Sequence, residues 1–107
     1  MRIVDIFKDC LKIQKKKSRD YQNTKSRIKQ VDYYPQGVLS IMNMIHTKTT
    51  RLWSLLESKD NPNYESLEDN AKDLINYTAF LIKYINYGFD GQDYKRNIFN
   101  EEMKNDK

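Results

Sequence analysis

A long stripe of apolar residues between positions 66 and 87 limits the fold of this chain more than any other feature. Side chains in the stripe recur every three or four positions, which places them on one face of an amphipathic helix. They are Leu67, Ala71, Leu74, Ile75, Thr78, Leu81, Ile82 and Ile85. Asn63 or Ser66 can cap the start of this helix, and Gly88 is suited to a left-handed stop. The sequence therefore predicts a long helix that ends near Tyr87.

Two further segments show helical spacing, and a third shows it weakly. Residues 38–58 carry a broad apolar arc, and residues 2–18 place their apolar side chains on one side. Residues 92–103 have the same spacing over a shorter span, which predicts a short C-terminal helix. Residues 19–37 lack sustained periodicity, so we expect a long loop there. Loops of this length in a compact domain are more often functional than structural.

The overall composition favours helices over strands. The chain has 107 residues but only three glycines and two prolines, too few for the turns of a sandwich or barrel. We predict one all-α domain at residues 1–103, a helical bundle of three main helices plus the short C-terminal helix, and a frayed tail at 104–107. Hydrophobic residues make up 38% and charged residues 32%. A balance this lean is typical either of an elongated bundle with much surface or of a protomer that completes its core against a partner, so we expect a homo-oligomer.

Positive charge is concentrated near the N-terminus. Residues 1–30 hold ten Lys and Arg against three Asp and Glu, a net charge of +7, whereas the remaining residues have a net charge of −3. A basic segment of this kind attracts polyphosphates, nucleic acid or acidic proteins through its long-range potential.

The single cysteine and the N-terminal residues bear on the compartment. Cys10 lies on the apolar side of the first predicted helix, which favours a small core residue over a nucleophile. Charged residues interrupt any signal-peptide core, and no apolar run approaches transmembrane length. We therefore expect a cytoplasmic protein that has no membrane partner.

Charged groups border the apolar faces of the second and third predicted helices. Lys48 and Arg51 lie on the edge of the apolar arc of the second helix, and Asp69, Asp73 and Asn76 share one side of the third. The lysine and arginine can reach water along the helix surface, and the acids can form an ordinary solvated face. Alternatively, the acids face the cations across a helix hairpin, or they bind a divalent cation that holds phosphates.

Several of these segments resemble a known family. They are Lys17-Ser-Arg-Asp20-Tyr21, Lys48-Thr-Thr-Arg51-Leu52, Glu65-Ser66 and Asp69-Asn-Ala-Lys-Asp73-Leu74-Ile75-Asn76-Tyr77. Together they are similar to a small helical family of phages and bacteria called nucleotide-modification-associated, which is related to the MazG-like all-α nucleoside triphosphate pyrophosphatases. The resemblance spans residues 12–87.

The resemblance implies an oligomeric helical fold with a nucleotide pocket lined by the second and third helices. The residues that it implies for ligand binding are Lys48, Arg51, Asp69, Asp73, Asn76, Tyr77, Asp20 and Tyr21. Glu65, Asp69 and Asp73 would be the ligands of a Mg²⁺ cofactor. MazG-like enzymes hold magnesium with two pairs of acids on successive helices. Here the second helix has no acid before Glu57, and the second pair reads Asn70-x-x-Asp73.

The reduced set of acids decides between two mechanisms. Hydrolysis of a pyrophosphate bond needs metal ions that neutralise phosphate and activate water. Because half of the ligand set is missing, we favour a protein that binds or sequesters a nucleotide or a nucleotide-derived signal, such as a signal of host defence, with Lys48 and Arg51 on its phosphates. The alternative is a magnesium-dependent pyrophosphatase of the MazG-like type.

Two other hypotheses stay open. One is nucleic-acid binding through the basic segment at residues 15–29, with Tyr21 or Tyr33 stacking on bases. The other is a small interaction protein whose helices dock on a partner through Trp53, Tyr77, Tyr84 and Tyr87.

Overall fold

The computed structural model describes residues 1–21, 25–58 and 64–92, and side chains are described for these residues except 19–21. Over this part of the chain the fold is all-α. Its helices are α1 (Ile3–Tyr21), α2 (Val38–Leu56) and α3 (Tyr64–Ile85), and a short 3-10 helix, η1 (Gln30–Tyr33), lies between α1 and α2. The three main helices are those that the periodicity predicts.

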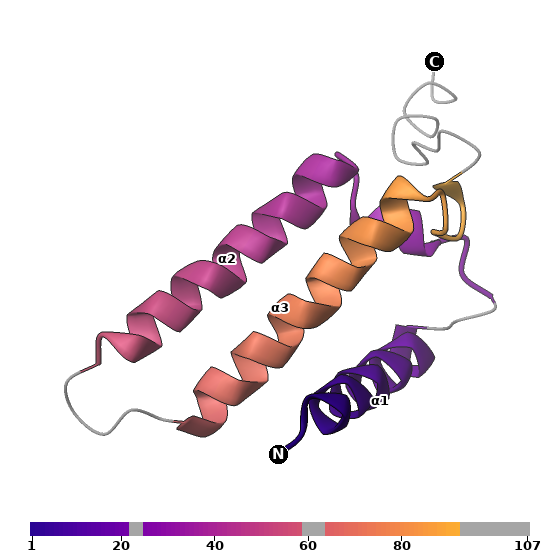
Figure 1. Cartoon of the computed structure of the whole chain (residues 1–107). Helices are drawn as coiled ribbons and strands as arrows, with labels where there is room; N and C mark the ends of the chain where they lie inside the picture. The colour runs from indigo at the N-terminus through magenta and orange to yellow at the C-terminus, as the bar shows by residue number, and fades with distance from the viewer. Residues whose placement is uncertain (22–24, 59–63, 93–107) are drawn as a thin grey trace.

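The helices form a layer with α3 in the middle. Figure 1 shows α2 and α3 as an antiparallel hairpin, with α1 beside α3 and running in the same direction as α3. The predicted C-terminal helix at 92–103 and the tail at 104–107 lie outside the described residues, apart from Gln92. Within the predicted loop at 19–37, α1 continues to Tyr21 and η1 forms a turn that packs near the end of α3.

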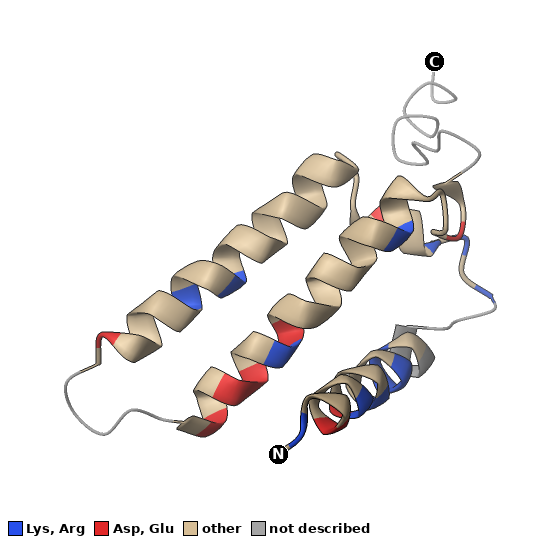
Figure 2. Ribbon diagram, viewed as in Figure 1, with Lys and Arg blue, Asp and Glu red and all other residues tan. Residues whose placement is uncertain are grey.

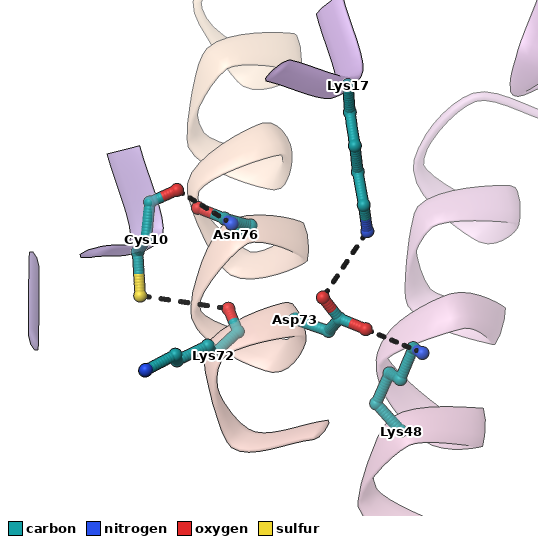
Figure 3. Close-up of polar contacts among 6 residues, drawn as sticks. All are labelled: Cys10, Lys17, Lys48, Lys72, Asp73 and Asn76. Carbon is teal, nitrogen blue, oxygen red and sulfur yellow. Dashed lines mark hydrogen bonds and ion pairs between the residues drawn. The ribbon is translucent and has the colours of Figure 1, made fainter. Parts of the chain in front are cut away.

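A buried amide and a buried cysteine dock α1 on α3. The side-chain amide of Asn76 donates a hydrogen bond to the carbonyl oxygen of Cys10 at 3.1 Å, and the Cys10 thiol lies 3.9 Å from the carbonyl oxygen of Lys72 (Figure 3). Lys72 also forms ion pairs with Asp9 at 3.5 Å and Glu68 at 3.4 Å. Cys10 is buried, as predicted for a core residue, and burial raises the pKa of its thiol.

Aromatic rings close the end of the bundle beyond α3. Phe89 is buried, and the rings of Tyr34 and Tyr84 each lie 5.4 Å from its ring centroid, with Phe80 at 6.2 Å. Gly37, which precedes α2, has a φ of 61°, and a Cβ atom there would lie 2.5 Å from the Tyr84 hydroxyl. This position needs glycine for both its conformation and its close contact with α3.

The end of α3 differs from the prediction in one detail. The residue in the left-handed conformation is Tyr87, with a φ of 57°, and not Gly88. The Gly88 N–H donates to the Lys83 carbonyl at 2.8 Å, and the Tyr87 N–H donates to the Tyr84 carbonyl at 3.0 Å. These two bonds form a Schellman motif. Position 88 favours glycine for lack of space and not for its backbone conformation, because a Cβ atom there would lie 2.8 Å from Lys83 Cγ.

The described residues leave many large apolar side chains exposed. Among the described residues the buried hydrophobic side chains are Cys10, Ile41 and Phe89. Large apolar side chains stay exposed on all three helices; they include Ile3, Phe7, Leu11, Leu39, Met42, Trp53, Leu56, Ile82 and Ile85. None of the described helices combines the length and the apolar character needed to cross a membrane.

Candidate functional site

One carboxylate joins all three helices. Asp73 on α3 accepts a hydrogen bond from the Lys48 ammonium of α2 at 2.9 Å, and its other oxygen lies 3.4 Å from the Lys17 ammonium of α1. Figure 3 shows the two lysines reaching Asp73 from opposite helices. Lys48 does not extend into water, since its side chain is only 12% exposed and that of Asp73 is 20% exposed. Half of the Lys17 side chain, in contrast, is in contact with solvent.

The two lysines control the ionisation of Asp73. Burial alone would raise the pKa of this carboxyl group. The hydrogen bond from Lys48 and the positive charge of Lys17 outweigh burial, so the pKa of Asp73 lies below its ordinary value. Asp73 is therefore ionised at neutral pH, and the group of Lys17, Lys48 and Asp73 has a net charge of +1.

Beside this ion pair lies a cavity of about 800 Å³, which we call the α1–α3 cavity. Its walls come from the C-terminal half of α1, from residues 26–34 and from one face of α3, with Met44 from α2 and Asp90 from the turn after α3. On α3 the lining residues Asp73, Tyr77, Phe80 and Lys83 follow one another at intervals of three or four. This spacing keeps all of them on the same face of the helix.

Aromatic and cationic side chains line the cavity together. The rings are Tyr33, Tyr34, Tyr77 and Phe80, and the lysines are Lys17, Lys29 and Lys83. Tyr77 and Phe80 pack edge to face with their ring centroids 5.9 Å apart. Such walls offer flat apolar surfaces to a ring and ammonium groups to an anion.

Polar residues at the end of the cavity near Lys83 hold the wall formed by residues 26–34 in place. The Lys83 ammonium donates a hydrogen bond to the Gln30 side-chain oxygen at 2.9 Å, which connects α3 to η1. Lys29 lies 3.9 Å from the Asp90 carboxylate. The Val31 N–H donates to the Asp90 carbonyl at 3.2 Å, which fixes η1 against the turn after α3.

The structure brings together some of the residues predicted from sequence and separates others. Asp73, Asn76 and Tyr77 line the α1–α3 cavity, and Lys48 contacts it through Asp73. Three more of the predicted residues, Arg51, Glu65 and Asp69, are exposed and do not line it. Asp20 and Tyr21 belong to the last turn of α1, but their side chains lie outside the description. The cavity thus lies between α1 and α3, whereas the resemblance implies a pocket lined by α2 and α3.

The predicted magnesium ligands do not gather at one point. Glu65, Asp69 and Asp73 follow one another along α3 at intervals of four, so each step moves about 6 Å along the helix axis. In the described part of the chain, no group of three or more His, Cys, Asp or Glu side chains could hold a metal ion. These carboxylates therefore do not fit a shared Mg²⁺ ion, and Asp73 bonds to lysines.

Sequence reasoning missed several lining residues, among them Tyr34, Phe80 and Lys83. Phe80 and Lys83 continue the helical spacing that begins at Asp73 and Tyr77, so extending that face would have found them. Nothing in the sequence places residues 26–34 against α3, because that contact depends on the tertiary fold.

Figure 2 shows the charge pattern of the helices, with acidic residues near the start of α3 and basic residues along α1 and on α2.

Comparison of the chain with family models, curated proteins and solved structures finds no match. The function is therefore inferred from the residues and the geometry of the α1–α3 cavity.

Proposed function

We propose that this protein binds a nucleotide or a nucleotide-derived signal in the α1–α3 cavity and holds it without hydrolysis. The observation that carries the proposal is that aromatic rings and lysines line a single cavity of about 800 Å³. Sites for small ligands typically enclose about 300–1,000 Å³, with apolar walls and a few polar groups that fix orientation. Rings suit a base, and ammonium groups suit phosphate.

Lys17 is the residue best suited to contact the phosphate. It lines the cavity, it is half exposed, and it shares the Asp73 carboxylate with the closer Lys48. Because Lys48 alone can neutralise Asp73, the Lys17 ammonium can turn to an incoming phosphate at little cost. Lys48 then keeps Asp73 from repelling the anion.

Tyr77 and Phe80 offer the surface for the base. They lie one turn further along α3, on the cavity wall between Asp73 and Lys83. Stacking of a base on an aromatic side chain contributes about 1–3 kcal/mol and tolerates different bases. We therefore expect the cavity to accept nucleotides that carry different bases.

Binding without turnover fits the acids better than hydrolysis does. Of the three predicted magnesium ligands only Asp73 lines the cavity, and lysines contact both of its oxygens. Pyrophosphate hydrolysis requires metal ions to neutralise the phosphates and to activate water.

The same proposal includes a cytoplasmic location, which keeps Cys10 reduced. It also includes kinship with the nucleotide-modification-associated family.

Isothermal titration calorimetry against nucleoside mono-, di- and triphosphates, with and without Mg²⁺, tests the proposal. At least one nucleotide should bind, and Lys17→Gln should weaken its binding about tenfold through the loss of one charged contact. Lys12→Gln is the matched control, because Lys12 is an exposed lysine of α1 that does not line the cavity. It should leave the affinity unchanged.

Three results would contradict the proposal. The first is that no nucleotide binds. The second is that Lys12→Gln and Lys17→Gln weaken binding equally, which would indicate attraction to the basic surface of α1 instead. The third is release of pyrophosphate from a triphosphate in the presence of Mg²⁺, which would make the protein a pyrophosphatase.

A further inference from the structure

The α1–α3 cavity has a positive group at each end and aromatic rings between them. Along α3 the lining residues run from Asp73, through Tyr77 and Phe80, to Lys83. Ten residues of helix separate the first from the last, a rise of about 15 Å. A single phosphate contacts groups within about 3 Å, so it cannot reach both ends.

Among the described residues, each end of the cavity has a lysine without a carboxylate of its own. At the first end, two lysines share the single carboxylate of Asp73. At the second end, Lys29 is paired with Asp90, but the Lys83 ammonium contacts only the neutral oxygen of Gln30 and the face of Phe89, 5.5 Å from the ring centroid. Within the described residues, Lys83 therefore has no carboxylate partner.

The Lys83 ammonium also has the freedom to take a second anion. Its contact with Gln30 is a hydrogen bond to a neutral acceptor, which a phosphate oxygen can replace with a stronger, charge-assisted bond. Lys83 is exposed, so a ligand can reach its ammonium group. The nearby Phe89 is buried and holds the end of α3 in place.

We propose that the α1–α3 cavity is a two-ended site for a short oligonucleotide. One phosphate lies at Lys17, where Lys48 neutralises the neighbouring Asp73, a second lies at Lys83, and the nucleosides between them lie against Tyr77 and Phe80. The inference rests on the proposed function, and it deepens that function by naming the class of ligand as one with two phosphates separated by nucleoside units.

The test compares thymidine 5′-monophosphate with 5′-phosphorylated thymidine oligonucleotides of two to four residues by calorimetry. The best oligonucleotide should bind about tenfold more tightly than the monophosphate, since it adds one charge-assisted contact. Lys83→Gln should remove this advantage, because it should weaken the binding of the oligonucleotide more than that of the monophosphate. Lys12→Gln should change neither affinity, and circular dichroism should show that both variants keep their helices.

A salt titration of the unmodified protein tests the same inference without a variant. The slope of log K against log salt concentration should be steeper for the oligonucleotide than for the monophosphate by about 0.7, the value for one additional phosphate contact with a single strand. This measurement remains decisive if Lys83→Gln does not fold.

The outcomes separate the two proposals. If the monophosphate binds and no oligonucleotide binds more tightly, or if the salt slopes are equal, the two-ended site is wrong and nucleotide binding stands. The same holds if Lys83→Gln weakens both ligands equally. If neither ligand binds, and no other nucleotide does, both proposals are wrong.

Discussion

At the scale of single residues, Asp73 connects the fold to the proposed site. It is the carboxylate that α1 and α2 both contact through lysines, and it lines the cavity in which we place the phosphate. Asn76, one turn further, has a structural role through its hydrogen bond to Cys10. The side chains that shape the site therefore also hold the helices together.

The lowered pKa of Asp73 predicts how stability depends on pH. A carboxyl group whose pKa is lower in the folded state stabilises the fold above its unfolded pKa of about 3.9. That contribution is lost as the pH falls through the folded pKa. Asp73→Asn should reduce the free energy of unfolding by about 1–2 kcal/mol at pH 7, because Lys48 loses its partner, and by less near pH 3. Urea denaturation at both pH values measures this difference.

Asp69→Asn is the control for this prediction. Asp69 is an exposed acid on the same helix, so its replacement should change stability little at either pH. Equal losses for the two variants, or a loss for Asp73→Asn that does not depend on pH, would show that the ion pairs of Asp73 do not stabilise the fold.

At the scale of elements, the Schellman motif after α3 contains a correctable strain. Tyr87 is exposed and adopts the left-handed conformation, which is costly for a residue with a Cβ atom. Tyr87→Gly should therefore raise the free energy of unfolding by about 1 kcal/mol. Gly88→Ala should lower it, since the added Cβ atom meets Lys83. Thermal denaturation of the two variants should show melting temperatures that shift in opposite directions, and a stabilised Gly88→Ala protein would contradict this account.

The elements also show what the sequence could predict. Periodicity located α1, α2 and α3, because the spacing of apolar residues is a local property. The pairing of Lys48 with an acid of α3 was among the predictions, since both lie on edges that an antiparallel hairpin brings together. The sequence does not predict where α1 and residues 26–34 pack in the fold. Their contacts with α3, such as Lys17 with Asp73 and Gln30 with Lys83, join residues far apart in the chain.

At the scale of the whole molecule, the exposed apolar side chains of the described residues are the reason why we expect self-association. Trp53 is 63% exposed on α2, and Leu39, Met42 and Leu56 on the same helix are also exposed. Apolar surface of this kind on a protomer with few buried hydrophobic residues typically belongs to an interface. We therefore expect a homo-oligomer that buries Trp53.

The single tryptophan makes this prediction easy to measure. Light scattering after size exclusion should give at least twice the protomer mass, and Trp53 emission should shift to shorter wavelength as protein concentration rises. Trp53→Glu should reduce the mass towards that of the protomer, because a charged side chain opposes burial. A monomer at all concentrations, with the emission of an exposed tryptophan, would contradict the expected assembly.

The central claim is that a nucleotide occupies the α1–α3 cavity, and an NMR titration that locates the ligand tests it most directly. Adding the best-binding nucleotide to ¹⁵N-labelled protein should shift the amide signals of Lys17, Tyr77 and Phe80, and it should leave those of Lys8 and Lys12 on the exposed face of α1 unchanged. Shifts confined to Lys8 and Lys12, with the cavity residues unaffected, would contradict the account.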